Sequence, residues 1–116
     1  MSYERPITEA ELTRAIRLLE ERGVWGIPRA KFSHFFGSDR RGRKIMAELR
    51  KRGRAAVIVT TGPDGKEVYR VAQDEAEYRR FRAQLISRIK ELELALVGLD
   101  EAWAAGGVRV AQKALF

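Results

Sequence analysis

The residues of this chain with the clearest chemical potential are cations, and they are concentrated in one stretch. Ten of the 23 Lys and Arg residues lie between positions 29 and 54, against only two acids, Asp39 and Glu48, which gives that stretch a net charge of +8. The whole chain carries +7, so the other residues together are slightly acidic. Localised positive charge attracts a polyanion and, on DNA, gains free energy by releasing counterions from phosphates. The alternative is a solvated helix face that only keeps the protein in solution, which would not require one sign in one place.

The chain offers few other groups with catalytic or ligating chemistry. It has no cysteine and one histidine, His34, which lies among phenylalanines. Such a setting is more typical of a packed or surface imidazole than of a metal ligand or a catalyst. There is no Gly-rich phosphate loop, no cluster of metal-ligating residues and no nucleophile paired with a base. The sequence therefore predicts no enzymatic activity, no cofactor and no metal.

Composition also indicates a compartment. No window approaches the roughly 18 apolar residues that a membrane span needs, and residues 1–6 lack the apolar stretch of a signal peptide. The absence of cysteine suits a reducing interior. We therefore expect a cytoplasmic, nucleoid-associated protein without a membrane partner, built as one compact unit with an appendage.

Two short helices separated by a tight turn must carry the basic stretch. Pro28 suits the first turn of the earlier helix, which would end at Gly37. Ser38 is placed to cap the later helix, predicted over 39–52 and ended by Gly53. Within it Gly42 costs about 1 kcal/mol relative to Ala, so either a neighbour or a DNA backbone approaches closely there, or the helix starts later.

A first helix and an apolar connector precede this pair. Thr8 and Glu11 form a capping box for a helix that runs to about Glu21, and Gly23 follows as its stop. Its apolar face consists of Leu12, Ala15, Ile16 and Leu19. The segment Val24, Trp25 and Ile27 predicts a short strand or apolar connector, with Trp25 in the core.

Extended structure and one long helix follow the basic stretch. Segments 55–61 and 66–71 predict a β-hairpin of about six residues per arm, turning at Gly62-Pro63-Asp64-Gly65. Asp74 then caps a helix, with Glu77 closing a second capping box. No strong break appears before Gly106, so the helix reaches about 30 residues, or roughly 45 Å.

An apolar seam runs the whole length of that last helix. Its members recur at steps of three and four, with two consecutive steps of four that resemble a stutter: Tyr78, Phe81, Leu85, Ile89, Leu92, Leu96, Leu99 and Trp103. A helix this long cannot bury its stripe on some 70 residues, so we expect a homodimer through it. The alternative is a local hairpin that folds back at Gly98. The tail 106–116 would be disordered or dock on the partner.

Three helices, the second and third joined by a tight turn, followed by a hairpin, resemble the winged helix-turn-helix family. The segment Phe36-Gly37-Ser38 resembles its turn, Ile45 and Leu49 its core-facing recognition-helix positions, and 55–71 its wing. The long last helix is similar to the dimer arm of MarR-like and PadR-like regulators and of small archaeal winged-helix chromatin proteins. The resemblance implies a mainly α fold with a small β-hairpin wing (α+β). It divides the chain into a DNA-binding domain (1–73), a dimerisation helix (74–105) and a tail (106–116).

A helical wheel separates structure from function within the third helix. Ile45, Leu49, Gly42 and Ser38 cluster on one side and should face the core. In the resembled family the N-terminal half of the opposite face enters the major groove, which implies base-reading roles for Arg40, Arg43, Lys44 and Ala47, the last against a thymine methyl group. The residues expected to hold the DNA backbone are Arg29, Lys31, Ser38, Arg50, Lys51, Arg54 and Lys66. Arg41 and Arg52 flank the core side and are equally suited to a structural role.

The resemblance and the charge together predict a dimeric transcriptional regulator that binds double-stranded DNA. Its two recognition helices would lie one helical turn apart, on palindromic half-sites. Two alternatives stay open. One is a sequence-tolerant architectural protein that coats DNA, and the other is a winged-helix adaptor that binds proteins.

Overall fold

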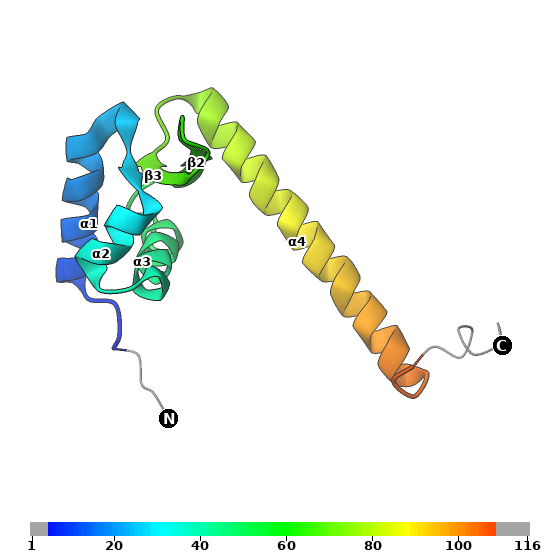
Figure 1. Cartoon of the computed structure of the whole chain (residues 1–116). Helices are drawn as coiled ribbons and strands as arrows, with labels where there is room; N and C mark the ends of the chain where they lie inside the picture. Colours follow the sequence, from blue (N-terminus) through cyan, green and yellow to red (C-terminus); the bar gives the residue numbers. More distant parts are fainter. Residues whose placement is uncertain (1–4, 109–116) are drawn as a thin grey trace. The chain divides into compact units, whose positions relative to one another are not determined.

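A computed structural model describes residues 5–108 and has the predicted fold class, mainly helical with a small antiparallel sheet (Figure 1). The chain divides into two compact units, residues 1–78 and 79–116. The first unit holds α1 (Glu9–Arg22), β1 (Ile27–Pro28), α2 (Arg29–Phe36), α3 (Asp39–Lys51), β2 (Val57–Thr61) and β3 (Glu67–Val71). The helix α4 (Glu75–Ala104) begins in the first unit and makes up most of the second.

The first helix is capped as predicted, but the connector after it differs from expectation. Thr8 and Glu11 form the reciprocal capping box of α1. A single 3₁₀ turn follows over Gly23–Trp25. Trp25, predicted to lie in the core, is 83% exposed. The cause is Gly26, whose φ of 66° turns the backbone tightly against β3, so that Ile27 instead of Trp25 enters the core.

The turn between α2 and α3 has the predicted chemistry. Gly37 ends α2 at a φ of 94°, and the Ser38 hydroxyl accepts a hydrogen bond from the Arg41 backbone N–H at 3.0 Å. The helix begins at Asp39, so its start is where the sequence predicts it. Gly42 is explained by close packing, since a Cβ there would lie 3.2 Å from the Phe32 ring and 3.6 Å from Ser33 Cα. A neighbour, α2, therefore approaches closely at this position.

The hairpin pairs with β1 in a three-stranded sheet of order β1-β3-β2. Each arm has five residues, one fewer than predicted. The register places Val59 and Ile27 opposite Tyr69 on its two sides. The third strand, β1, lies at the end of the segment predicted as a short strand or an apolar connector. Two residues are too few to show a strand periodicity, so the sequence could not decide between the two.

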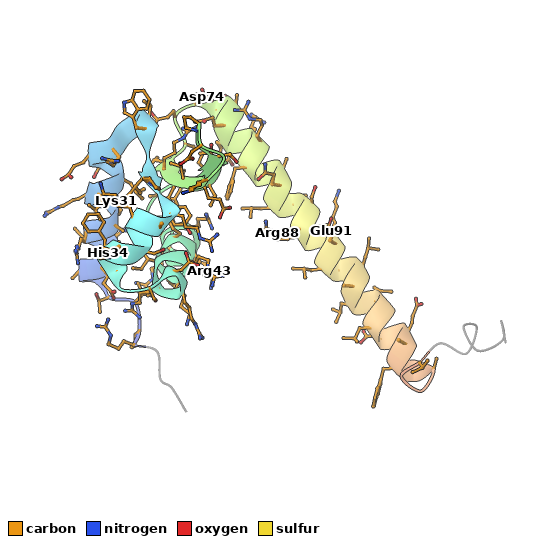
Figure 2. The ribbon with its side chains drawn as sticks, viewed as in Figure 1. Lys31, His34, Arg43, Asp74, Arg88 and Glu91 are labelled. Carbon is orange, nitrogen blue, oxygen red and sulfur yellow. The ribbon has the colours of Figure 1, made fainter. Side chains whose placement is uncertain are left out.

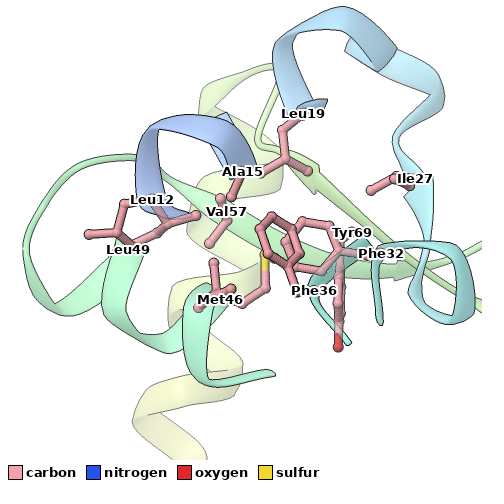
Figure 3. Close-up of a cluster of buried hydrophobic side chains, with 11 residues drawn as sticks. Leu12, Ala15, Leu19, Ile27, Phe32, Phe36, Met46, Leu49, Val57 and Tyr69 are labelled. Carbon is pink, nitrogen blue, oxygen red and sulfur yellow. The ribbon is translucent and has the colours of Figure 1, made fainter. Parts of the chain in front are cut away.

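One cluster of buried side chains holds the first unit together. Figure 3 shows its members converging from the three helices and the sheet. The Phe32 ring packs edge-on against Tyr69, with centroids 5.2 Å apart, and lies 4.9 Å from the Phe36 ring. The buried side chains of α1 and α3 include Leu12, Ala15, Leu19, Ile45 and Leu49, all predicted on core-facing stripes, together with Met46.

The last helix is continuous from Glu75 to Ala104, passing straight through Gly98. The alternative of a local hairpin at Gly98 is therefore wrong. Asp74 caps the helix by accepting from the Glu77 N–H at 2.9 Å. The Glu77 carboxylate accepts from the Gln73 N–H and from Arg70, so this end is tied to β3 as well as capped. Part of the predicted tail, residues 109–116, lies outside the described residues.

Candidate nucleic-acid interface

The exposed face of α3 carries the cations that the helical wheel placed there. Arg40, Arg43, Lys44 and Lys51 are exposed, whereas Ala47 and Arg50 are half-buried. Gly42, Ile45 and Leu49 are buried on the opposite face, as predicted. Ser38 instead is exposed, because its cap position precedes the helix. The helix thus has one apolar side in the core and one cationic side toward solvent.

Arg43, labelled in Figure 2, is an exposed member of this cationic face. Its Nε is 3.1 Å from Asp39 Oδ2, one helical turn earlier. An exposed ion pair of this kind contributes little, typically about 0.3–0.5 kcal/mol, so a phosphate or a guanine can replace Asp39 at small cost. This contact therefore orients the Arg43 guanidinium and leaves it able to bind another anion.

Arg41 has a structural role, which resolves one of the two open assignments. It is 5% exposed and extends from α3 to the start of α1. Its Nε donates to Glu11 at 2.9 Å and its Nη2 to the Pro6 carbonyl at 3.0 Å. The hydrogen bond from Arg41 lowers the pKa of Glu11 to about 2. The pair fixes the N-terminal end of α3 against α1.

Arg29 lies at the junction of three elements. Its Nε and Nη2 donate to the two carboxylate oxygens of Asp39, each at 2.7 Å, and Nη1 pairs with Glu67 on the hairpin. The Ser33 hydroxyl also donates to Asp39, at 3.0 Å. The bond from Arg29 holds the pKa of Asp39 well below its ordinary value, and the two carboxylates raise that of Arg29. Arg29, expected on a phosphate, instead joins α2, the start of α3 and the hairpin.

Three more arginines of the basic stretch make contacts within the first unit. Arg52 donates to Glu48 at 2.9 Å and to Glu9 at 3.0 Å, and Arg54 pairs with the same Glu9. Arg50 Nε donates to the Val57 carbonyl at 3.0 Å. These contacts tie the end of α3 to α1 and β2. They make Arg54 and Arg50 weaker candidates for DNA-backbone contact than their sequence positions suggested.

Three lysines of the candidate interface differ from these arginines. Within residues 5–108, Lys31 on α2, Lys51 on α3 and Lys66 at the hairpin turn are exposed and have no ion-pair partner. Lys66 follows Asp64, whose carboxylate accepts from the Lys66 backbone N–H at 3.0 Å. The turn therefore carries one cation beside one acid. The hairpin adds little net positive charge to that of α3.

An open groove of about 680 Å³ separates the hairpin turn from the starts of α2 and α3. Arg29, Asp39, Lys66 and Glu67 line it, together with small residues of α2. Two of its charged lining residues, Asp39 and Glu67, are carboxylates that already pair with Arg29. The groove separates α3 from the turn, and its chemistry does not favour an anion. Across residues 5–108, no three His, Cys, Asp or Glu side chains gather where they would hold a metal ion.

The seam predicted on α4 is exposed over most of its length. Six of its eight members are 48–80% exposed, and Phe81 and Leu85 are half-buried. The structure adds Leu94 and Val97, exposed apolar residues that lie off the predicted seam. No helix among the described residues is long and apolar enough to cross a membrane.

Comparison with known protein families, with curated proteins and with solved structures finds no match for this chain.

Proposed function

We propose that this protein binds double-stranded DNA as a dimeric winged-helix transcriptional regulator. The observation that carries the proposal is the exposed cationic face of α3, which follows a tight turn and opposes a fully buried apolar face. A helix of this kind fits the major groove, where Arg can donate two hydrogen bonds to a guanine. Arg40, Arg43 and Lys44 are the proposed base-reading residues, and Ala47 would contact a thymine methyl group.

The division of the arginines supports this assignment. Arg29, Arg41 and Arg52 hold α3 against its neighbours by pairing with carboxylates. A rigid support lowers the entropy lost when the exposed cations meet DNA, because the helix is already fixed in place. Lys31, Lys51 and Lys66 are proposed to contact phosphates, which would set the register without reading sequence.

A second candidate is a sequence-tolerant architectural DNA-binding protein. It is favoured by the composition of the exposed α3 face, which has Arg, Lys and Ala but no Asn or Gln to recognise adenine. Cations alone can hold the phosphate backbone of any sequence. The two candidates differ in whether affinity depends on sequence.

Selection of bound duplexes from a random pool, at two salt concentrations, tests both candidates. The regulator predicts enrichment of a palindrome, and the architectural protein predicts salt-sensitive binding without enrichment. Absence of binding at low salt would refute both and favour a protein-binding adaptor.

The α3 face is tested by the triple variant Arg40→Ala, Arg43→Ala, Lys44→Ala in fluorescence anisotropy on the selected duplex. A good bidentate contact to a base contributes about 1–3 kcal/mol of discrimination, so the variant should lose at least about tenfold in affinity for the selected duplex, together with its preference over a scrambled one. Arg17→Ala, an exposed cation of α1, is the single-charge control and should change affinity little. Equal affinity of triple variant and parent would rule out α3 as the interface.

A further inference from the structure

Beyond its first turn, which holds Glu75 and Glu77, the charges of α4 are segregated along its length. Between positions 79 and 90 the only charged residues are basic: Arg79, Arg80, Arg82, Arg88 and Lys90. From 91 to the end of the helix the only charged residues are acidic: Glu91, Glu93, Asp100 and Glu101. Residues 79–104 lie in one continuous helix, so a basic stretch is followed by an acidic stretch along the same helix axis.

The exposed apolar seam has a matching symmetry. Reflection through the point between Lys90 and Glu91 exchanges Tyr78 with Trp103, Leu85 with Leu96, and Ile89 with Leu92. The remaining two members, Phe81 and Leu99, miss each other by one residue. A seam that maps onto itself when reversed can pack against a reversed copy of itself, with large side chains opposite large side chains.

We infer that α4 pairs antiparallel with α4 of a second copy of this chain, centred between Lys90 and Glu91. This deepens the dimer of the proposed function and rests on it. In the antiparallel arrangement each basic half lies along the partner's acidic half. A parallel arrangement would place the five bases beside the same five bases, and the four acids beside the same four acids. The opposed helix dipoles add to the preference.

The charged residues beside the seam predict a specific ion pair between the two copies. Arg82 and Asp100 each follow a seam residue directly, Phe81 and Leu99, so they lie on the same border of the stripe. Antiparallel pairing about the stated centre brings Arg82 of one copy beside Asp100 of the other, twice in the dimer. A parallel pair would instead bring together Arg88 and Glu93 on one side of the seam, whereas in the antiparallel pair these two lie at the same height but on opposite sides, with the apolar seam between them.

Antiparallel pairing also separates the two starts of the helices. Residue 78 of one copy would lie opposite residue 103 of the other, so the two Tyr78 positions are roughly 38 Å apart along the axis, at 1.5 Å per residue. In a parallel pair they would be about 10 Å apart, the usual interaxial distance. The spacing of any two DNA-binding surfaces that the dimer presents depends on this choice.

Spin-label distances in the full chain separate the two arrangements. The natural chain has no cysteine, so Asp100→Cys and Lys90→Cys each introduce a single labelling site. Antiparallel pairing places the labels at 100 about 30 Å apart and those at 90 about 10 Å apart, by the same helix geometry. Labels within about 10 Å at both positions would establish the parallel arrangement and overturn the inference.

Charge reversal provides an independent test by sedimentation equilibrium. Arg82→Glu should weaken dimerisation by about tenfold, and adding Asp100→Arg to it should restore the parent value. The matched pair Arg88→Glu and Arg88→Glu/Glu93→Arg should show no such rescue; rescue in this pair alone would contradict the antiparallel arrangement. A parent that stays monomeric at the concentrations used for DNA binding would also overturn the inference. Sequence-selective DNA binding is measured in a separate experiment. If the chain showed none, the proposed function would be refuted, but the antiparallel pairing of α4 would not.

Discussion

At the scale of single residues, the cations of the basic stretch include some that pair with carboxylates of other elements and some that are exposed without an ion-pair partner. Arg41 and Arg29 pair with carboxylates from other elements and are part of the scaffold. Lys31, Lys51 and Lys66 are exposed and have no ion-pair partner within residues 5–108. The net charge of the basic stretch therefore overstates the positive charge available at the surface, because Glu9, Glu11 and Glu67 already neutralise part of it.

Removing the Arg41 side chain should destabilise the first unit. Arg41→Ala leaves the largely buried Glu11 carboxylate without its main partner and frees two backbone carbonyls, a loss of about 2–3 kcal/mol. Urea denaturation followed by circular dichroism measures it. Arg43→Ala, an exposed neighbour, should change stability by less than about 0.5 kcal/mol. Equal stabilities for the two variants would contradict a structural role for Arg41.

The same pair predicts a pH dependence. The folded-state pKa of Glu11 is about 2 and its ordinary value is 4.5, so its contribution is fully present above pH 4.5 and is lost as pH falls toward 2. Glu11→Gln should therefore be less stable than the parent at pH 7, with a difference that shrinks between pH 4.5 and 2. Denaturation at several pH values measures the difference. A constant difference across this range would show that the carboxylate charge does not stabilise the fold.

At the scale of elements, local signals in the sequence were sufficient for helices and turns. Thr8, Ser38 and Asp74 cap their helices as predicted, since a side-chain oxygen and its N–H partner are three residues apart in the chain. Gly37 ends α2 as predicted. Local signals do not decide the environment of Gly42, which packs against α2, and the prediction that Trp25 lies in the core is wrong. Both depend on contacts with elements that are distant in the sequence or belong to another helix.

Two glycines in helix interiors should respond in opposite ways to the same substitution. Gly98→Ala places a methyl group in open space and should stabilise α4 by up to about 1 kcal/mol through helix propensity. Gly42→Ala gains the same propensity but forces a Cβ to 3.2 Å from the fully buried Phe32 ring, an overpacking that costs about 1–3 kcal/mol. Thermal unfolding of both variants measures the contrast. A stabilised Gly42→Ala would show that α2 yields easily.

At the scale of the whole molecule, α4 is a long helix whose apolar seam is mostly exposed and can be buried by a partner helix. Helices in proteins owe most of their stability to the packing of an apolar face against another element. For the exposed seam of α4 we propose that this element is a second copy of the helix. The apolar residues Leu94 and Val97 lie away from that seam, and a two-helix pair does not account for them.

This separation of faces gives a matched test of dimerisation. Leu92→Asp places a charge at the centre of the proposed seam and should weaken dimerisation by more than about 100-fold, or roughly 2.7 kcal/mol. Leu94→Asp makes the same change off the seam and should leave the dimer intact. Analytical ultracentrifugation measures both. Affinity for the selected palindrome should fall with the first variant only, and equal behaviour of the two would contradict the seam.

Taken by itself, the sequence determined the order of helices and turns, the apolar face of α3 and the continuous seam of α4. Each of these depends on residues a few positions apart, where helix geometry alone dictates which side chains share a face. Only the tertiary structure decided which arginines are scaffold and which remain exposed. Arg41 finds Glu11, and Arg54 finds Glu9, across 30 and 45 residues of chain. An arginine that holds the fold and one proposed to contact DNA look alike in sequence, because the difference lies in which carboxylate the packed core brings within reach.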